Sequence, residues 1–342
     1  MKSGQVTIKD IARELSISPS TVSRSLKDHP DISPGTKKAV NDLAKQLNYQ
    51  PNAVALSLRK NKTNTIGVVV PEFVHYFFST VLSGIEEVAN KSGYNVLISQ
   101  SHESYQQEAN DIKALISHRV DGLLVSLSRE TVNFDQLKEI HERGIPLVFF
   151  DRICEDIDTS RVIVDDYDGA FQAVNHLVEQ GCRRIAHLAG PHRLLISKNR
   201  LNGYKAALEK HGIPIDPALV LESVHHNDHL EVRKLTLSFL ELSEPPDAIF
   251  ANHDLVAITA MKVLKEKGLR IPQDIAMVGF SDWQMSAFVE PSLTSVSQPG
   301  FEIGQEAARL FIQQVEADNG TFKPETKIFK TRLIVRDSSK RK

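Results

Sequence analysis

The sequence predicts an all-α helix-turn-helix headpiece followed by a larger α/β body of two doubly wound parallel-sheet lobes. Three observations support this prediction. The chain has 342 residues, enough for about two domains, each with its own core. Its first sixty or so residues contain short helical patterns. From Thr65 onward, short β-branched runs alternate with helical segments of about 10–15 residues, which is typical of parallel sheets.

Composition limits the classes of protein to which the chain can belong. It is 41% hydrophobic and 25% charged, which is ordinary for a soluble globular protein. No apolar run reaches the roughly 18 residues of a membrane span, and residues 1–8 lack the apolar stretch of a signal peptide. We therefore expect a cytoplasmic protein without membrane contacts. Cys154 and Cys182 are the only cysteines, so reduced structural thiols are expected rather than a disulfide framework.

The net charge of −2 conceals two parts of opposite sign. Residues 1–62 carry 11 Lys and Arg against 5 Asp and Glu, a charge of +6, and the remainder carries 30 against 38, a charge of −8. A basic segment joined to an acidic body is typical of a module that binds a polyanion. Because many solvated helices are also basic, this signal needs a motif to support it.

The N-terminal helical patterns are short and separately capped. Apolar positions recur at helical spacing in Ile8–Leu15, and a three-residue break precedes a second helix over Pro19–Leu26. A third helix is predicted over about Pro34–Leu47. The tight turn, and a second helix that is short and polar outward, match a helix-turn-helix. A generic three-helix bundle would explain the apolar spacing, but not the small polar residues and Arg24 on the second helix.

This region resembles the lac repressor (LacI/GalR) family of bacterial transcriptional regulators. The resemblance is carried by VTIKDIARELSISPSTVSRSL, ISPGTKKAV and LNYQPNAVALSLRK, and the pairing of TVSR with NYxPN about 25 residues later is specific. It extends over essentially the whole chain. It implies a periplasmic-binding-protein-like sensor for the α/β body, binding of double-stranded operator DNA by the headpiece, and a small-molecule effector, expected to be a sugar or sugar derivative.

The resemblance also implies which residues meet DNA. The start of the second helix enters the major groove, so Pro19, Ser20 and Arg24 are placed to reach base edges, and Arg24 can form the bidentate contact to guanine. Because Pro19 and Ser20 are short, readout is expected to lean on Arg24, Ser20 and DNA shape. Hydroxyl-bearing residues near the helix starts are placed to hold phosphates. The complete expected set is Thr7, Ser18, Pro19, Ser20, Thr21, Ser23, Arg24, Ser33, Thr36, Asn52, Ala55 and Leu58.

A short apolar and basic run follows the headpiece. Pro51 stops the third helix and Asn52 caps AVALSLRK, which is too short to be a stable helix alone. In the resembled family this hinge folds on operator DNA beside its symmetry mate, and the residue aligned with Leu58 wedges into the minor groove and kinks the duplex. A packed linker residue is the alternative for Leu58, although Arg59 and Lys60 flank it.

The α/β body repeats strand and helix patterns. Strands are predicted at TIGVVVP, YNVLIS, VDGLLVSL, PLVFFD, RVIVDD, RRIAHLAG, PDAIFAN and IAMVGFSD, with another near Lys327–Val335. Helices are predicted near Glu108–His118 and Phe134–Arg143. Strands separated by helices of this length favour two successive doubly wound sheets.

The family architecture implies that the chain crosses between the lobes three times, near Asp151–Val162, Pro291 and Lys323–Thr326. The ligand then lies in the cleft at the carboxyl ends of the strands. The expected domains are residues 1–50 for the helix-turn-helix, 51–62 for the hinge and 63–342 for the ligand-binding domain. Within the last, we expect an N-lobe of about 63–155 and 292–323 and a C-lobe of about 162–290 and 326–340.

No sequence pattern requires catalysis. No strand is followed by G-x-G-x-x-G and no P-loop is present, so nucleotide binding has no support. His225, His226 and His229 could form a metal cluster, but no Cys or carboxylate lies at clear ligand spacing, so a solvated loop is expected. No Ser/His/Asp arrangement stands out. We expect a binding protein rather than an enzyme, with no metal and no cofactor.

Candidate ligand contacts follow the predicted strand ends. After the first strand, PEFVHYFF places His75, Phe77 and Phe78 where sugar-binding relatives have a polar residue and aromatics. An aromatic face covers the apolar side of a sugar ring, while polar groups fix its hydroxyls. Packing in the core is the alternative for these Phe residues, and we expect it to hold for one of them.

Charged residues at other strand and helix ends complete the expected site. Asp151 and Arg200 align with ligand-contacting positions of the family. In GFSDW, Ser281 stands where the family has Asp, so Asp282 is expected to make the contact, with Trp283 as a wall of the cleft. Asp165 follows the strand RVIVDD, and Asp254 follows a strand end in IFANHD. The resemblance places His225 where the family has an aromatic that stacks on the ligand. The complete expected set is His75, Phe77, Phe78, Asp151, Asp165, Arg200, His225, Asp254 and Asp282.

The expected assembly is a homodimer that presents two headpieces to a pseudo-palindromic operator, with half-sites about one helical turn apart. Ligand in the cleft is expected to change the angle between the lobes, and with it the spacing of the hinges and the operator affinity, with a coupling of about 1–3 kcal/mol. Two alternatives remain. One is a regulator switched by a phosphoprotein partner; the other is a sugar-binding transport receptor, against which the attached headpiece argues.

Overall fold

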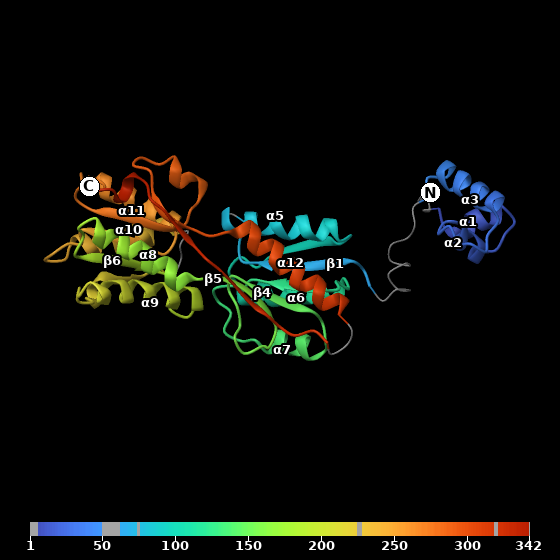
Figure 1. Ribbon diagram of the computed structural model, residues 1–342, viewed down its shortest axis with the longest axis horizontal. Helices are drawn as coiled ribbons and strands as arrows, with labels where there is room; N and C mark the ends of the chain where they lie inside the picture. Colours follow the sequence, from blue (N-terminus) through green and yellow to red (C-terminus); the bar gives the residue numbers. More distant parts are fainter. Residues whose placement is uncertain (1–5, 50–61, 74–75, 224–227, 318–320, 342) are drawn as a thin grey trace. The chain divides into compact units, whose positions relative to one another are not determined.

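The computed structural model describes residues 6–49, 62–73, 76–223, 228–317 and 321–341. The chain divides into two compact units, Met1–Asn64 and Thr65–Lys342 (Figure 1). The first unit contains short α-helices, and the second contains two sheets with helices on both faces. The predicted fold class, an all-α headpiece followed by an α/β body of two lobes, is confirmed. None of the helices in the described ranges has the length and apolarity needed to span a membrane.

The headpiece consists of α1 (Ile8–Glu14), α2 (Pro19–Ser25) and α3 (Pro34–Gln46). A hydroxyl caps the start of α2 and of α3, because the first N–H groups of a helix lack partners within it. Ser18 Oγ accepts from the N–H of Thr21 at 3.1 Å, and Ser33 Oγ accepts from the N–H of Thr36 at 3.2 Å. The helices pack around a small buried core of Ile11, Ala12, Val22, Val40 and Ala44.

The N-lobe is a parallel sheet with the strand order β11-β5-β4-β3-β1-β2. Its strands are β1 (Thr65–Val70), β2 (Asn95–Gln100), β3 (Gly122–Val125), β4 (Leu147–Phe150), β5 (Ser160–Val164) and β11 (Thr326–Phe329). Helices α5 (Tyr76–Lys91) and α12 (Gly300–Glu316) cover one face, and α6 (Tyr105–Ser117) and α7 (Asp135–Glu142) cover the other. Because helices bury both faces, β1, β3 and β4 are apolar almost throughout.

The C-lobe repeats this architecture with the strand order β12-β10-β9-β8-β6-β7, parallel except where β12 runs antiparallel to β10. Its strands are β6 (Ile185–Ala189), β7 (Val220–Glu222), β8 (Ala248–Ala251), β9 (Ala276–Ser281), β10 (Thr294–Ser297) and β12 (Arg332–Ile334). Helices α8 (Asp166–Glu179) and α9 (Leu195–Lys210) pack on one face, and α10 (His229–Leu240) and α11 (Asp254–Glu266) on the other. The parallel order directs the carboxyl ends of the main strands of each sheet to one edge.

The first crossing between the lobes lies further along the chain than expected. Strand β5 pairs with β4 through Val148 and Ser160, so it still belongs to the N-lobe. The crossing therefore lies between Val164 and Asp166 rather than near Asp151–Val162. The apolar run RVIVDD looks like any other strand, and only its hydrogen bonds to the edge of β4 assign it to a lobe.

The second and third crossings are displaced in the same way. Strand β10 pairs with β9 in the C-lobe, so the chain returns between Ser297 and Gly300 rather than near Pro291. Strand β11 pairs with β5, so the last crossing follows Phe329, where an extended segment links the sheets (Figure 1). The lobe boundaries are corrected accordingly: the N-lobe holds residues 65–164 and 300–329, and the C-lobe holds 166–297 and 332–339.

Two further strand assignments differ from the sequence prediction. The single strand expected near Lys327–Val335 is split into β11 and β12, which belong to different sheets. Strands β7 and β10 were not predicted, because one is short and half-buried and the other is the polar run TSVS. The helices expected near Glu108–His118 and Phe134–Arg143 are present as α6 and α7, with ends shifted by one to three residues.

Two glycines allow α5 and α12 to approach closely in the N-lobe. A Cβ at Gly84 would collide with the backbone carbonyl oxygen of Phe301, and one at Gly304 would collide with the carbonyl oxygen of Val81. The obstructing atoms are backbone, so they cannot rotate away as a flexible side chain would. Gly84 in LSGIEE and Gly304 in EIGQEA are therefore the residues that permit this close helix–helix contact.

We predict that Gly304→Ala destabilises the sensor body even though alanine favours a helix by about 1 kcal/mol over glycine. The collision requires α5 and α12 to separate, and overpacking of this kind typically costs about 1–3 kcal/mol or more. Urea unfolding of the full chain measures the change. Ser83→Ala, at an exposed position of α5, is the control and should stay within about 0.5 kcal/mol of the parent. An unchanged Gly304→Ala transition would contradict the close contact.

Candidate functional site

The exposed side of α2 carries the residues expected to read bases. Pro19, Ser20 and Arg24 are exposed, whereas Val22 is buried in the headpiece core. Ser18 Oγ lies 2.7 Å from Ser20 Oγ and 2.8 Å from Thr21 Oγ1, so these hydroxyls form one connected group at the start of the helix. Asn52, Ala55 and Leu58 lie outside the described residues.

The remaining expected DNA contacts lie near helix starts. The carboxylate of Asp10 accepts from the Thr7 N–H at 2.9 Å and from the Thr7 hydroxyl at 2.6 Å. Ser33 and Thr36 share a hydroxyl contact of 2.8 Å in the same way at α3. Ser23 is half-buried on α2. These contacts order the surface hydroxyls without burying them.

A pocket of about 840 Å³ lies between the two lobes of the sensor body. The N-termini of α5 and α12 form one side, and the end of β9 with the short 3₁₀ helix η2 (Gln284–Ala287) forms the other. Gln284 Nε2 reaches Tyr76 OH across it at 3.3 Å. Its lining is aromatic and polar: Tyr76, Phe77, Thr80, Ser281, Asp282, Trp283, Gln284, Ala287, Phe288, Ser297, Gln298, Pro299, Gly300, Phe301, Glu302, Lys330, Arg332 and Arg336.

Unusual backbone geometry marks the C-lobe side of this pocket. Ser281 has φ 108° and Asp282 has φ 48°. A positive φ is costly for residues other than glycine, and such residues concentrate at ligand sites. The turn directs Asp282 toward Arg336, with 2.8 Å between the carboxylate and the guanidinium. Of the expected ligand contacts, Asp282 and Phe77 line this pocket, together with the expected wall residue Trp283.

Arg200 is buried and fully occupied by partners within the C-lobe. Its Nε and Nη2 contact Asp166 Oδ1 at 2.8 and 2.7 Å, and its Nη1 donates to the carbonyl of Asn252 at 2.6 Å. The guanidinium carbon also lies 3.7 Å from the ring centroid of Phe280. Burial raises the pKa of Asp166, and the charge of Arg200 opposes that rise. The short contacts between Arg200 and Asp166 define a buried ion pair.

A second buried ion pair lies at the carboxyl edge of the N-lobe sheet. Arg152 Nη1 contacts Glu103 Oε2 at 2.7 Å, and both side chains are almost fully buried. Asp151 precedes Arg152 directly after β4 and is 8% exposed. Burial raises the pKa of Asp151 to about 6, partly offset by the charge of Arg152. Asp166 and Arg200 of the other lobe also act on the pKa of Asp151, so the two ion pairs face one cleft.

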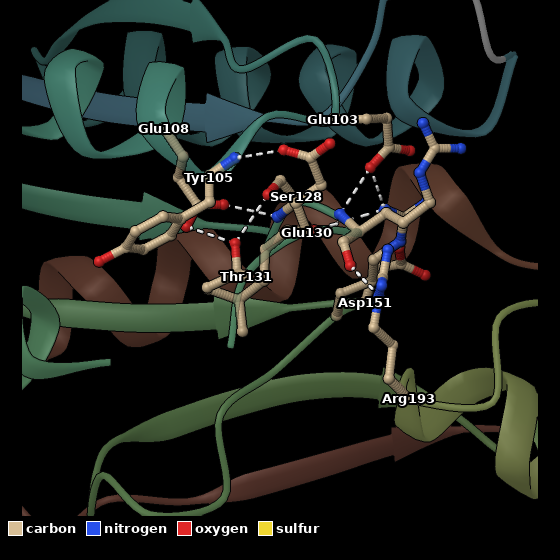
Figure 2. A network of polar contacts seen from close by, with 11 residues as sticks. Glu103, Tyr105, Glu108, Ser128, Glu130, Thr131, Asp151 and Arg193 are labelled. Atoms are coloured by element: carbon tan, nitrogen blue, oxygen red, sulfur yellow. Dashed lines mark hydrogen bonds and ion pairs between the residues drawn. The ribbon is translucent and has the colours of Figure 1, made fainter. Parts of the chain in front are cut away.

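The loop between β3 and α7 is fixed by two buried carboxylates (Figure 2). Glu108 accepts from the Ser128 N–H at 2.5 Å and from the Thr131 hydroxyl at 2.8 Å, and Glu103 accepts from the Arg129 N–H at 2.7 Å. Held in this way, the loop presents the Arg129 carbonyl oxygen to Arg193 Nε of the C-lobe at 2.6 Å. This contact joins the lobes across the cleft.

Within the described residues, five neutral polar atoms at strand ends have no hydrogen-bond partner. They are buried, and each follows the carboxyl end of a strand. In a parallel sheet these ends share one edge, so both lobes contribute to the same inter-lobe region. The atoms are Ser101 Oγ after β2, Ser126 Oγ after β3, Ser223 Oγ after β7, Asn252 Oδ1 after β8 and Gln298 Nε2 after β10.

The structure places several expected ligand contacts away from an open surface. Asp254 is 0% exposed, and it accepts from Ser295 Oγ at 2.5 Å, Trp283 N–H at 2.6 Å and Ser286 Oγ at 2.8 Å. Both carboxylate oxygens of Asp254 are therefore engaged by donors of the protein, and Asp254 stabilises the turn after β9 rather than facing a ligand. Asp165 caps α8 by accepting from the Asp168 N–H.

The remaining residues expected to contact ligand are paired or buried in the structure, or lie outside the described residues. Asp165 also pairs with Lys330 at 3.0 Å. Phe78 is a core residue, as expected for one of the two phenylalanines, and Phe77 both packs in the core and lines the pocket. His75 and His225 lie outside the described residues. Within the described ranges, no group of three or more His, Cys, Asp or Glu could hold a metal.

Sequence reasoning missed the partners of the charged residues that it found. Asp166 is the buried partner of Arg200, and Glu103 that of Arg152. Gln298 was missed because β10 was not predicted, although its place directly before Pro299 at a strand end was a usable signal. Arg336 was missed because this partner of Asp282 lies just after β12, more than fifty residues later in the chain.

A helix-turn-helix headpiece joined to a two-lobed body with a cleft at the strand ends defines a DNA-binding regulator with a ligand-binding domain. Comparison with known proteins agrees. The family described as periplasmic binding proteins and sugar binding domain of LacI family matches residues 63–334, and the family of bacterial regulatory proteins, lacI family, matches residues 7–52. The chain belongs to the LacI family and is a transcriptional repressor of that family.

Individual relatives match over nearly their whole length. The HTH-type transcriptional repressor CytR of Escherichia coli strain K12 is 33% identical over 98% of this chain and 96% of its own. Catabolite control protein A of Priestia megaterium is 33% identical over 92% and 93%. The lac repressor dimer bound to operator and the anti-inducer ONPF has a TM-score of 0.85 at 25% identity, covering 98% of this chain and 99% of that one. A CelR–cellobiose complex has a TM-score of 0.74 at 30% identity, covering 97% and 99%.

We predict that Asp254→Asn destabilises the sensor body by about 1–3 kcal/mol, because an amide cannot accept from every donor that now meets the carboxylate. Burial raises the pKa of Asp254 to about 6 from 3.8. Protonation therefore favours the folded state below about pH 4, and this contribution is lost as the pH rises through 6. The stability gap between parent and variant should be wider at pH 5 than at pH 7.

Denaturant unfolding at several pH values measures this gap. Asp158→Asn removes an exposed carboxylate of the N-lobe and serves as the control. If Asp254→Asn is as stable as the parent at every pH but binds effector differently, the structural role is contradicted and Asp254 is a ligand contact.

Proposed function

We propose that this repressor is controlled by a small molecule in the inter-lobe cleft and binds a pseudo-palindromic operator as a homodimer. The carrying observation is the aromatic and polar pocket between the lobes, on a chain that also has a helix-turn-helix. Gln298, whose Nε2 is buried without a hydrogen-bond partner among the described residues, lines this pocket. Concave sites of this kind, with a few convergent polar groups, are the usual form of a small-molecule site. We further propose that the chain acts in the cytoplasm and has no catalytic role.

The headpiece supports direct reading by few side chains. Arg24 is the one long donor on the exposed side of α2, among the described residues of that helix. Ser20 is short and its hydroxyl contacts that of Ser18. We propose that Arg24 and Ser20 read bases and that the capping hydroxyls of Thr7, Ser18 and Ser33 position phosphates. The proposed DNA contacts also include Thr21, Ser23, Thr36 and Pro19 in the headpiece, and Asn52, Ala55 and Leu58 in the hinge.

We predict that Arg24→Ala weakens specific operator binding by about 1–3 kcal/mol, roughly 5- to 150-fold, and relaxes preference at one base pair of each half-site. Arg24→Lys is the matched control, since it keeps the charge but loses the bidentate geometry. It should retain affinity for non-specific DNA and lose discrimination. Fluorescence anisotropy with an operator selected from random DNA, at fixed salt, measures both. Equal discrimination in the three proteins would contradict base reading by Arg24.

Exposed apolar side chains support the homodimer. Leu97 and Ile98 on the edge strand β2 are 40% and 46% exposed, and Phe288 in the C-lobe is 79% exposed. Ile258 and Val289 border a further apolar groove beside α11. Exposed apolar side chains that lie together commonly mark a protein–protein interface. Two copies related by a twofold axis would present two headpieces to symmetric half-sites. A similar structure is that of a lac repressor dimer bound to operator.

We predict that Ile98→Asp shifts the chain from dimer to monomer, because a charge at the centre of an apolar interface loses its hydration without gaining a partner. Sedimentation velocity at micromolar concentration measures the change. Val132→Asp places the same charge at a 72% exposed site on another part of the N-lobe and should leave the dimer intact. A dimer that survives Ile98→Asp, or that is equally lost in Val132→Asp, would contradict this interface.

The proposed switch is a change in the angle between the lobes. A ligand in the cleft contacts both lobes at once, so it can favour one angle over another and thereby alter the spacing of the hinges. The Arg193 contact to the Arg129 carbonyl spans the same gap and would form or break with that movement. A sugar or sugar derivative is favoured as effector by Tyr76, Phe77 and Trp283 in the pocket wall. Related structures carry cellobiose and ribose.

Operator selection from random DNA, repeated with and without a panel of sugars, tests the proposal as a whole. We expect a symmetric site whose occupancy changes with one class of sugar. Selection of an asymmetric site would contradict the dimer. A symmetric site with no response to any small molecule, but with a response to a phosphorylated protein, would favour the alternative switch.

A further inference from the structure

The charged side chains buried between the lobes include more acids than bases. Glu103, Asp151 and Asp166 are the acids, and Arg152 and Arg200 are the bases, with every one of these side chains 8% exposed or less. Arg152 meets Glu103 at 2.7 Å and Arg200 meets Asp166 at 2.7 Å. Asp151 is then the acid of this group without a cation of its own, whereas the nearby buried Glu108 accepts from the Ser128 N–H and the Thr131 hydroxyl. Asp151 contacts Arg152 only at 3.9 Å, and Arg152 is already paired with Glu103.

The cations of the adjoining pocket are engaged in the same way or lie at its rim. Arg336 meets Asp282 at 2.8 Å, and Lys330 meets Asp165 at 3.0 Å. Arg332 and Arg193 are exposed to solvent, where screening weakens their attraction for an anion. Within the described residues, therefore, the cleft offers a bound molecule no buried cation that lacks a carboxylate.

Arg152 Nε is also buried without a hydrogen-bond partner, but its guanidinium is already paired with Glu103. Carboxylates aside, the other unpartnered groups at the described strand ends are neutral. They are the hydroxyls of Ser101, Ser126 and Ser223 and the side-chain amides of Asn252 and Gln298. Hydroxyls donate and accept, and amides do both from a fixed plane, which suits a ligand whose own polar groups are hydroxyls. A carboxylate such as Asp151 adds an acceptor for ligand O–H groups and repels an anion.

We infer that the effector is an uncharged cyclic polyol, such as a free sugar or the sugar of a nucleoside, and that Asp151 excludes its phosphorylated counterpart. This inference rests on the proposed function of the cleft. A phosphate group bound there would lose its hydration and lie near the carboxylate of Asp151, with no unpaired buried cation to offset its charge. Burial of a charge without such compensation is costly. The same reasoning makes Asp151 a specificity-determining residue rather than a general contact.

The test uses the full-length chain and matched pairs of probes: ribose and ribose 5-phosphate, glucose and glucose 6-phosphate, and cytidine and cytidine 5′-phosphate. Isothermal titration calorimetry reports the Kd of each. We expect at least one uncharged member to bind, with its phosphorylated partner at least about tenfold weaker. Phosphorylated members that bind as well as or better than uncharged ones would overturn this inference and leave the proposed function standing. No binding by any pair would contradict the small-molecule site itself.

Asp151→Asn separates exclusion by charge from exclusion by size. Asparagine has the shape of aspartate and tolerates the φ of 60° found at this position. We expect it to reduce the preference for the uncharged member at least about tenfold, with a circular dichroism melt showing that the variant folds. Asp158→Asn makes the same change in net charge at an exposed site of the N-lobe and should leave the preference unchanged. Unaltered discrimination in Asp151→Asn would overturn the role of Asp151.

Discussion

Charged side chains can lie buried between the two lobes only because each cation there meets a carboxylate. An unpaired ion in that position would cost several kcal/mol. Arg200 is held by Asp166, by the Asn252 carbonyl and by the ring of Phe280, so its geometry is set before any ligand arrives. Arg152 is held by Glu103, which also anchors the neighbouring loop. The ion pairs thus fix the geometry of the cleft walls. The neutral hydroxyls and amides at the strand ends are the groups available to hydrogen-bond a ligand.

The same walls carry the proposed link between ligand binding and DNA binding. Parallel sheets direct their strand ends to one edge, and the chain passes between the lobes next to that edge, after β5, β10 and β11. A molecule in the cleft therefore acts where the lobes are linked. The loop that carries Arg129 is rigid because Glu103 and Glu108 hold its backbone. A rigid receiving surface lets a small change in lobe angle make or break the contact with Arg193.

The site was predictable from the sequence to the extent that its residues lie in local patterns. Arg200 and Asp151 follow recognisable segments, and both lie buried at the cleft. Asp254 follows a strand end in the same way, yet it faces Ser286 and Ser295 and supports the turn after β9. A strand end places a side chain near the cleft, but the packing of the next elements decides whether it faces a ligand or a neighbouring hydroxyl.

The sequence by itself determined the class of the protein. Cap residues and helical spacing in the first fifty residues specify a helix-turn-helix, and the alternation of strands and helices specifies doubly wound sheets, because both are local patterns. Only the tertiary structure decided which sheet each crossing strand joins, since β11 and β12 are one continuous run in the sequence. It also decided which charges cancel. Arg336 and Asp282 are far apart along the chain, and only the folding of β12 against β10 brings them together.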